Sequence, residues 1–255
     1  MRLDLLLVEK KLASSRTLAQ ELIKNGFVYR LEAEQKNYLL KSNIDVPDDW
    51  TRFIFVENNA FQKFVSRGGL KLEAALKHLN IKLEKKIVLD VGQSTGGFTD
   101  CLLQNGAQFV VGVDVGRDQL HADLKKNQNM VSIESLHVNA LSQNEMFLKH
   151  VPKDGFDLIV TDVSFISLTK VMSYLKPFLK PKGHFLFLVK PQFEAGSNAL
   201  DKNGIVKDEK TYDLVQTIVS EEAGKIFGRV IDFFKSELQG KDGNQEFFIY
   251  GQNEI

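Results

Sequence analysis

Residues 88–103 read VLDVGQSTGGFTDCLL, and this stretch indicates a strand, a glycine-rich turn and a helix in succession. The apolar run Ile87–Val91 precedes the turn Gly92–Gly97, and a helical pattern continues from Phe98. Such a junction lets the backbone approach a ligand closely and directs helix N–H groups toward it. The glycines do not match the G-x-G-x-x-G pattern, and no Lys-Ser/Thr follows them as in a Walker loop. Taken alone, the turn fits either a cofactor site or a tight structural turn.

Apolar runs rich in Val, Ile and Phe recur from this junction to the C-terminal end. They lie at Ile87–Val91, Phe109–Val115, Met130–Ile133, Phe156–Val163, His184–Val189, Val230–Phe234 and Glu246–Tyr250. Helical stretches such as 169–179 and 212–227 separate the first six runs, which predicts a mostly parallel sheet covered by helices on both faces. Only SELQGKDGNQ joins the last two runs, so we expect the final strand to run antiparallel at or near an edge. The pattern predicts an α/β fold of the Rossmann-like type.

Acidic residues end the first two predicted strands. Asp90 closes the first, and Asp114 closes the second within VVGVDVG. A carboxylate at this point can accept hydrogen bonds from ribose hydroxyls, as it does in dinucleotide and S-adenosylmethionine sites. With Asp114 there and seven alternating strands, S-adenosylmethionine is the favoured cofactor.

Other polar residues lie at or inside the apolar runs. Asp162 ends FDLIVTDVSF, Lys190 ends GHFLFLVKPQFE, and Glu246 opens EFFIY. Because the carboxyl ends of parallel strands face one crevice, we expect Asp162 and Lys190 to converge near the cofactor. Lys71 follows Arg67 and two glycines in VSRGGLKLEAAL, where it is either a solvated helix residue or a cation placed for use.

The composition fits a globular intracellular protein. With 255 residues and 43% hydrophobic content, the chain can bury a sizeable core and form one large domain with a smaller companion. Lys+Arg and Asp+Glu balance at 33 each, so net charge neither predicts nor excludes a nucleic-acid partner. The single cysteine, Cys101, suits a reducing cytosol. No signal peptide and no run of about 18 apolar residues is evident, so we expect a cytoplasmic location and no stable membrane association.

The first 58 residues form a separate α+β module. Residues 3–12 predict a helix, a second helix capped by Ser14 or Ser15 stops at Gly26, and short strands follow. Residues 1–30 hold six basic groups against three acidic ones, whereas residues 31–60 hold three against six. Any RNA contact is therefore assigned to the first two helices. We place a linker at 59–64 and the second domain at 65–255.

The sequence resembles the TlyA-type ribosomal RNA 2′-O-methyltransferases, often labelled haemolysins. These motifs carry the resemblance: SRGGLKL, LDVGQSTGGFTDCLL, VGVDVGRDQL, DLIVTDVSFISL, LVKPQFEAG, GIVKDEKTYDLV and GNQEFF, with RLDLLLVEKKLASSRTLAQELIKNGFV at the N-terminus. The resemblance implies a ribosomal-protein-S-four-like RNA-binding domain joined to an FtsJ-like, class I S-adenosylmethionine-dependent methyltransferase domain.

The resemblance also implies a catalytic Lys-Asp-Lys-Glu set, Lys71, Asp162, Lys190 and Glu246, which we call the tetrad. Lys190 would act as the base or orient the ribose oxygen, Asp162 and Glu246 would hold and tune the lysines, and Lys71 would complete the cluster. No metal is expected, since the histidines and the cysteine lack ligand spacing.

The expected contacts follow from the same motifs. For the cofactor they are Asp90, Gly92, Ser94, Gly96, Gly97, Phe98, Asp114, Val115 and Asn139, with either Asn139 or a neighbouring residue facing the adenine. For RNA they are Arg2, Lys10, Lys11, Ser15, Arg16, Lys24 and Arg67. Gln93 stands where the family usually has a small residue, which could crowd or rearrange the loop beside the cofactor.

The expected activity is 2′-O-methylation of ribosomal RNA, alone or in ribosomal subunits, with cytidine as the family precedent. Two alternatives stay open. One is a non-catalytic RNA-binding or ribosome-assembly protein that keeps the fold, and the other is a membrane-active haemolysin. Each tetrad residue also has an ordinary structural explanation, such as a solvated helix lysine or a turn-capping aspartate. Only their joint occurrence in order favours the enzyme. The oligomeric state is not predicted.

Overall fold

The computed structural model describes residues 1–13, 16–24, 26–33, 35–56, 63–240 and 243–254. The chain divides into two compact units, Met1–Arg67 and Gly68–Ile255. The predicted linker at 59–64 falls mostly outside the described residues, as do the serines expected to cap the second helix. The proposed domain limits therefore stay predictions.

The first unit packs two helices with a small antiparallel sheet. Its elements are α1 (Leu3–Glu9), α2 (Arg16–Lys24), β1 (Val28–Glu32), β2 (Gln35–Tyr38), the 3₁₀ helix η1 (Asp48–Phe53) and β3 (Ile54–Val56). The strands run in the order β2-β1-β3. Strand β2 was not predicted, because its sequence QKNY is polar and only its last residue is partly buried. Strand β2 forms through antiparallel pairing with β1, which the spacing of apolar residues in its own sequence does not reveal.

A buried carboxylate ties the two helices of this unit together. Asp4 is fully buried and accepts hydrogen bonds from Arg2, from Arg16 at 2.9 Å and from Gln20 at 2.8 Å. Burial alone would raise the pKa of Asp4, but these hydrogen bonds and the charge of Arg16 outweigh it and hold the pKa well below its usual range.

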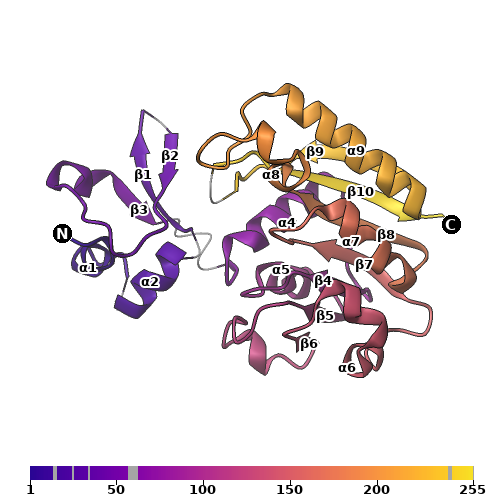
Figure 1. The fold of residues 1–255 in the computed structure, drawn as a ribbon. Coiled ribbons are helices and arrows are strands. Elements are labelled where there is room, and N and C mark those ends of the chain that lie inside the picture. The colour runs from indigo at the N-terminus through magenta and orange to yellow at the C-terminus, as the bar shows by residue number, and fades with distance from the viewer. Residues whose placement is uncertain (14–15, 25, 34, 57–62, 241–242, 255) are drawn as a thin grey trace. The chain divides into compact units, whose positions relative to one another are not determined.

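The second unit is built on one seven-stranded sheet (Figure 1). The strands are β4 (Ile87–Val91), β5 (Phe109–Val113), β6 (Met130–Ile133), β7 (Phe156–Thr161), β8 (Leu179–Val189), β9 (Gly228–Lys235) and β10 (Phe247–Asn253). They run in the order β6-β5-β4-β7-β8-β10-β9, and β10 pairs antiparallel with both of its neighbours. The mostly parallel sheet with an antiparallel last strand is confirmed, and that strand lies second from the edge.

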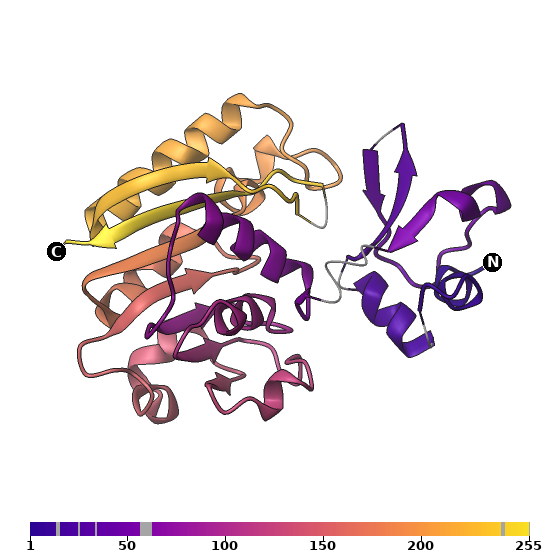
Figure 2. The same ribbon diagram turned by 180° about the vertical axis from the view of Figure 1, so that it is seen from behind.

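Helices cover both faces of this sheet. They are α4 (Arg67–His78), α5 (Gly97–Gln104), α6 (Glu145–Leu148), α7 (Leu168–Leu175), α8 (Pro191–Glu194) and α9 (Lys210–Phe227), with 3₁₀ turns η2 (Leu124–Lys126), η3 (Val138–Gln143), η4 (Lys176–Phe178) and η5 (Ser197–Ala199). Helices α7 and α9 lie on one face, and α4 and α5 lie on the other, as Figure 2 shows from behind. No helix within the described residues is both long and apolar enough to span a bilayer.

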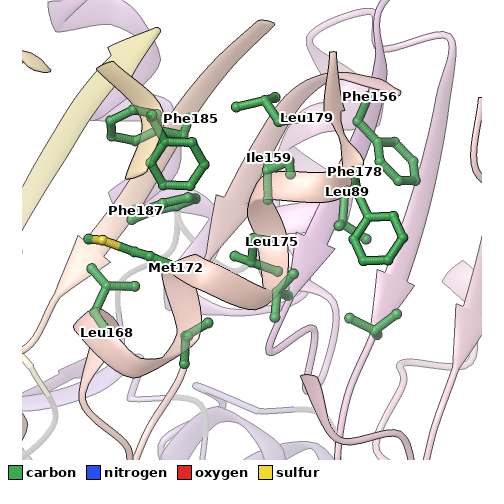
Figure 3. Packing of buried hydrophobic residues seen from close by; sticks show 14 of the residues in the cluster. Leu89, Phe156, Ile159, Leu168, Met172, Leu175, Phe178, Leu179, Phe185 and Phe187 are labelled. Atoms are coloured by element: carbon green, nitrogen blue, oxygen red, sulfur yellow. The ribbon is translucent and has the colours of Figure 1, made fainter. Parts of the chain in front are cut away.

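The core on the α7 face fixes the start of that helix. Leu168, Met172 and Leu175 recur at helical spacing and are buried against the sheet, where Phe185 and Phe187 of β8 pack (Figure 3). Burial of one such side chain stabilises the fold by about 1.5–3 kcal/mol. Because Leu168 is the first residue of α7, this packing also anchors the end of the loop that follows β7.

Candidate active site

The glycine-rich turn brings the ends of two strands close together. Gly92 has a φ of +84°, and a Cβ there would lie 2.6 Å from the carbonyl oxygen of Asp162. The Asp162 N–H donates to the carbonyl of Val91 at 2.9 Å. Glycine is therefore required both by the backbone conformation and by the approach of the neighbouring segment. The carboxyl ends of β4 and β7 meet here, so Asp162 lies beside the turn, as its position at a strand end predicts.

Asp114 holds the turn from the next strand. Its Oδ2 accepts from the Ser94 N–H at 2.7 Å, and its Oδ1 accepts from the Gly116 N–H at 2.6 Å. Each carboxylate oxygen has a second lone pair, so these bonds leave acceptor capacity for ribose hydroxyls. Val115 is exposed next to it. The loop beyond is held by Glu134, whose carboxylate accepts from three backbone N–H groups at 118–120, an anchor that the sequence did not reveal.

Gln93 is buried in a chain of polar side chains. Its Oε1 accepts from Ser132 at 2.6 Å, and its Nε2 donates to the Thr99 hydroxyl at 2.8 Å. That hydroxyl donates to Asp90 Oδ2 at 2.7 Å. A Cβ at Gly112 would lie 1.9 Å from Gln93 Nε2, so the glycine on β5 makes the room that this larger side chain needs. Gln93, which stands where a small residue was expected, is thus packed over Gly112 of the sheet.

Asp90 is a buried carboxyl group with one unsatisfied oxygen. Burial raises its pKa to about 7, the hydrogen bond from Thr99 opposes the rise, and the charges of Asp162 and Asp114 add to it. Its Oδ1 has no hydrogen-bond partner among the described residues. An acceptor without a partner beside a glycine-rich turn fits a ligand that carries donor groups, such as the ammonium of S-adenosylmethionine. Together with Asp114, the residues present therefore fit this cofactor.

Asp90 is expected to make stability depend on pH. Because its folded-state pKa of about 7 exceeds the ordinary value of 3.8, the folded protein keeps a proton that the unfolded chain releases. This stabilisation is complete below the unfolded pKa and is lost as the pH rises toward 7, at about 1.4 kcal/mol per unit. Asp90→Asn keeps an acceptor for Thr99 and removes this slope. Chemical unfolding of the ligand-free protein between about pH 5 and 7 measures it, with the exposed Asp154→Asn as control. Parallel curves for Asp90→Asn and wild type would contradict the assignment.

The tetrad forms two ion pairs drawn from distant parts of the chain. Lys190, directly after β8, has its Nζ 2.6 Å from Asp162 Oδ1, directly after β7. Lys71 of α4 donates to Glu246 Oε2, and Glu246 directly precedes β10. Lys71 and Glu246 are only 8% and 3% exposed, so little water screens the second pair. The convergence of Asp162 and Lys190 was expected from parallel strands, whereas the second pair rested on the family resemblance alone.

The electrostatics of Glu246 link the two pairs. Burial raises the pKa of Glu246 and the negative charge of Asp162 adds to the rise, while the ammonium groups of Lys71 and Lys190 oppose it. All four side chains therefore contribute to one local field. Two cations beside two carboxylates, with Asp90 close enough to interact with Asp162, make a polar cluster suited to moving or holding a proton.

The loop after β7 contributes two residues that the sequence did not single out for the site. Ser164 Oγ accepts from Lys190 Nζ at 2.8 Å, so this lysine is held by a hydroxyl as well as by Asp162. Phe165 is 91% exposed and has a φ of +65°, a backbone conformation that residues other than glycine rarely adopt. This exposed aromatic ring, on the residue that follows Ser164, offers a surface on which another ring can stack.

The remaining predicted contacts lie at separate places in the two units. For the cofactor, Gly96 precedes α5, Gly97 begins it, Phe98 is buried within it, and Asn139 is exposed in η3. For RNA, Arg2 and Arg16 are engaged with Asp4, Lys10 donates to the Thr51 carbonyl, Lys11 and Lys24 are exposed, Arg67 begins α4, and Ser15 lies outside the described residues. Both assignments stay predictions.

Across the described part of the chain, no group of three or more His, Cys, Asp or Glu side chains is arranged to hold a metal.

Comparison with known proteins identifies the family. The model of the FtsJ-like methyltransferase family matches residues 64–253, which is most of the chain. The protein belongs to the FtsJ-like methyltransferase family. Residues 1–30 match the S4 domain, ahead of the FtsJ-like part.

Relatives of this FtsJ-like protein carry two kinds of name. The 23S rRNA (cytidine-2′-O)-methyltransferase TlyA of Campylobacter jejuni is 34% identical, over 98% of this chain and 98% of its own length. The 16S/23S rRNA (cytidine-2′-O)-methyltransferase TlyA of Mycobacterium tuberculosis is 34% identical, over 98% and 88%. Hemolysin A of Brachyspira hyodysenteriae is 36% identical, over 98% and 99%. These matches confirm the resemblance seen in the motifs.

Solved structures share the fold. A candidate hemolysin from Streptococcus thermophilus is 32% identical with a TM-score of 0.73, covering 99% of this chain and 88% of its own. An S-adenosylmethionine-dependent methyltransferase from Mesorhizobium loti, only 14% identical, has a TM-score of 0.50 and covers 71% of this chain and 97% of its own. The second match shows a common architecture and confirms the Rossmann-like class of the fold.

Proposed function

We propose that this protein transfers a methyl group from S-adenosylmethionine to a ribose 2′-hydroxyl of ribosomal RNA, with a cytidine as the target. The observation that supports this most is the meeting of two lysine–carboxylate pairs, one of which has its carboxylate residue, Asp162, beside the glycine-rich turn. Methylation of a hydroxyl requires that its proton be removed or held, and a lysine flanked by carboxylates provides such a group. The names of the TlyA relatives support ribosomal RNA and cytidine as the substrate.

The cofactor would be held by the residues around the turn. Asp114 would accept from its ribose hydroxyls, Asp90 from its ammonium, and the backbone of Gly92–Gly97 would lie against it. When bound, S-adenosylmethionine supplies a methyl group already activated by the positive sulfur. The protein would then need to align the ribose oxygen and to manage its proton.

Lys190 would manage that proton. Its uncharged amine would take the proton from the ribose 2′-oxygen, and Asp162 and Ser164 would then stabilise the ammonium that results. Lys71 and Glu246 would complete the field around the oxygen without touching the proton. Phe165 would offer its exposed ring to an unpaired base, which is how proteins commonly hold a nucleotide taken out of a stack.

Direct assay of methyl transfer tests the proposal. Purified protein is incubated with methyl-labelled S-adenosylmethionine and either naked ribosomal RNA or separate subunits lacking the modification. Label is expected at the 2′-oxygen of a ribose, mapped by resistance of the adjacent phosphodiester to alkali. Wild-type protein that binds the donor and yet labels none of these substrates would exclude the enzyme and favour a non-catalytic RNA-binding role.

A further inference from the structure

Two neighbouring loops carry the two members of the Lys190–Asp162 pair. The first joins β7 to α7 and holds Asp162, Ser164 and Phe165, while the second runs from Lys190 through the single turn of α8. Because β7 and β8 are parallel neighbours, both loops emerge at the same end of the sheet. The ladder of backbone hydrogen bonds between β7 and β8 ends before these loops begin. Side-chain contacts therefore hold one loop against the other.

Glu194, at the end of α8, makes those contacts. Its Oε1 accepts from the Leu168 N–H at 2.7 Å, and its Oε2 accepts from Ser167 Oγ at 2.7 Å. The Thr169 N–H adds to the interactions that lower the pKa of this carboxylate. Ser167 occupies the cap position of α7 but gives its helix no side-chain cap of its own. The exposed N–H groups of the first turn are thus satisfied by a carboxylate from the next loop, which the helix dipole also favours.

A second contact joins the same loops. The ring of Phe165 lies 5.4 Å from that of Phe193, the residue before Glu194. Between Lys190 and Glu194 there is only one helical turn, and it begins with Pro191, whose ring restricts the backbone. A shift of Glu194 relative to α7 would therefore be transmitted to Lys190 over a short and stiff segment. Burial raises the pKa of Glu194 while its hydrogen bonds oppose the rise, as expected for a carboxylate largely removed from water.

We propose that Glu194 is a positioning residue for methyl transfer, which locks the loop after β7 to α8 and so fixes Asp162 and Ser164 against Lys190. This rests on the proposed function. The pair Lys190–Asp162 and the contact Glu194–Leu168 are the two ends of one clamp, with five residues of chain between Asp162 and Leu168 and three between Lys190 and Glu194. Misplacement of a reacting group by about 1 Å can lower a rate by about 10²-fold.

The test uses Glu194→Gln in the full-length protein. Glutamine keeps the size but has one acceptor oxygen and no charge, so the bond to Ser167 or to the Leu168 N–H must reverse or break, and the charge at the start of α7 is lost. We expect kcat for methyl transfer to fall by roughly 10- to 100-fold, with the KM for S-adenosylmethionine and the Tm nearly unchanged. The Leu168 and Thr169 amides should exchange hydrogen faster. Glu221→Gln, an exposed change on α9, is the matched control.

The outcomes separate a positioning role from a merely structural one. A lower Tm with unchanged kcat per folded molecule would overturn the proposal, and so would faster amide exchange with unchanged kcat. If Glu194→Gln does not fold, Ser167→Ala removes one of the two side-chain contacts and should give a smaller fall in kcat, whereas an unchanged kcat contradicts the clamp. Wild-type protein that methylates nothing refutes the proposed function instead, and the clamp is then judged by amide exchange alone, where an unchanged rate at Leu168 rejects it.

Discussion

Lys190→Ala lowers the rate of methyl transfer by about 10²-fold or more and leaves the binding of S-adenosylmethionine nearly unchanged. A positioned acid or base typically contributes about 10²–10⁴-fold, and Lys190 is the tetrad residue held by both Asp162 and the Ser164 hydroxyl. Single-turnover transfer of labelled methyl measures the rate, and calorimetric titration with the cofactor measures binding. Lys153→Ala, an exposed lysine in the loop before β7, is the matched control.

Lys190→Arg separates the two roles that the sequence left open for this lysine. Arginine keeps the positive charge but does not release its proton at neutral pH, so it can orient an oxygen and cannot act as a base. We expect Lys190→Arg to be nearly as inactive as Lys190→Ala. An arginine variant with most of the wild-type rate would assign Lys190 to orientation alone, and an alanine variant with that rate would remove it from the mechanism.

The sequence predicted the parts of the site that follow from strand geometry. Asp162 and Lys190 end neighbouring apolar runs, and parallel strands bring such ends together without further information. Lys71 and Glu246 could not be paired in this way, because α4 precedes the sheet and β10 enters it antiparallel from a hairpin. Their meeting depends on tertiary packing, and only the resemblance to a family implied it.

The sequence did not predict contacts that depend on one particular side chain finding another. The Gln93 chain needs Thr99 from α5, Ser132 from β6 and the absence of a side chain at Gly112, three conditions with no common spacing. Glu194 caps a helix whose own sequence offers Ser167, the usual kind of capping residue. Periodicity and turn-forming residues indicate local structure only. They therefore do not predict which side chains of different segments will pair.

Lys71→Met is expected to lower the free energy of unfolding by about 3–5 kcal/mol, because it leaves the buried carboxylate of Glu246 without its partner. Two buried charges are costly to desolvate, and removal of one partner leaves that cost uncompensated for the other. Lys77 on the same helix, whose side chain is 71% exposed and pairs with Glu73 at 3.5 Å, provides the control. Lys77→Met should cost at most about 1 kcal/mol, since the Lys77 ammonium lies in water and an ion pair one helical turn apart contributes little.

The loss of unfolding free energy in Lys71→Met should depend on pH, because the protonation of Glu246 does. Its pKa is already raised in the folded state, and removal of Lys71 removes a charge that opposes the rise. The stabilisation from a raised carboxyl pKa is present below the unfolded pKa and disappears as the pH rises through the folded one. Lys71→Met should therefore destabilise the protein less near pH 5 than near pH 8, because a higher pKa of Glu246 in the variant favours its protonated form as the pH falls. Urea unfolding at the two pH values measures this, and an equal loss at both contradicts it.

The double variant Lys71→Met/Glu246→Gln separates stability from catalysis. Without the charge on either partner, the buried site no longer contains an unpaired ion, so most of the lost unfolding free energy should return. Methyl transfer should not return, because the field that Lys71 and Glu246 add around the ribose oxygen is absent whether or not the protein is stable. If the double variant regains both stability and the wild-type rate, the buried pair serves only the fold, and the active site reduces to Asp162, Ser164 and Lys190.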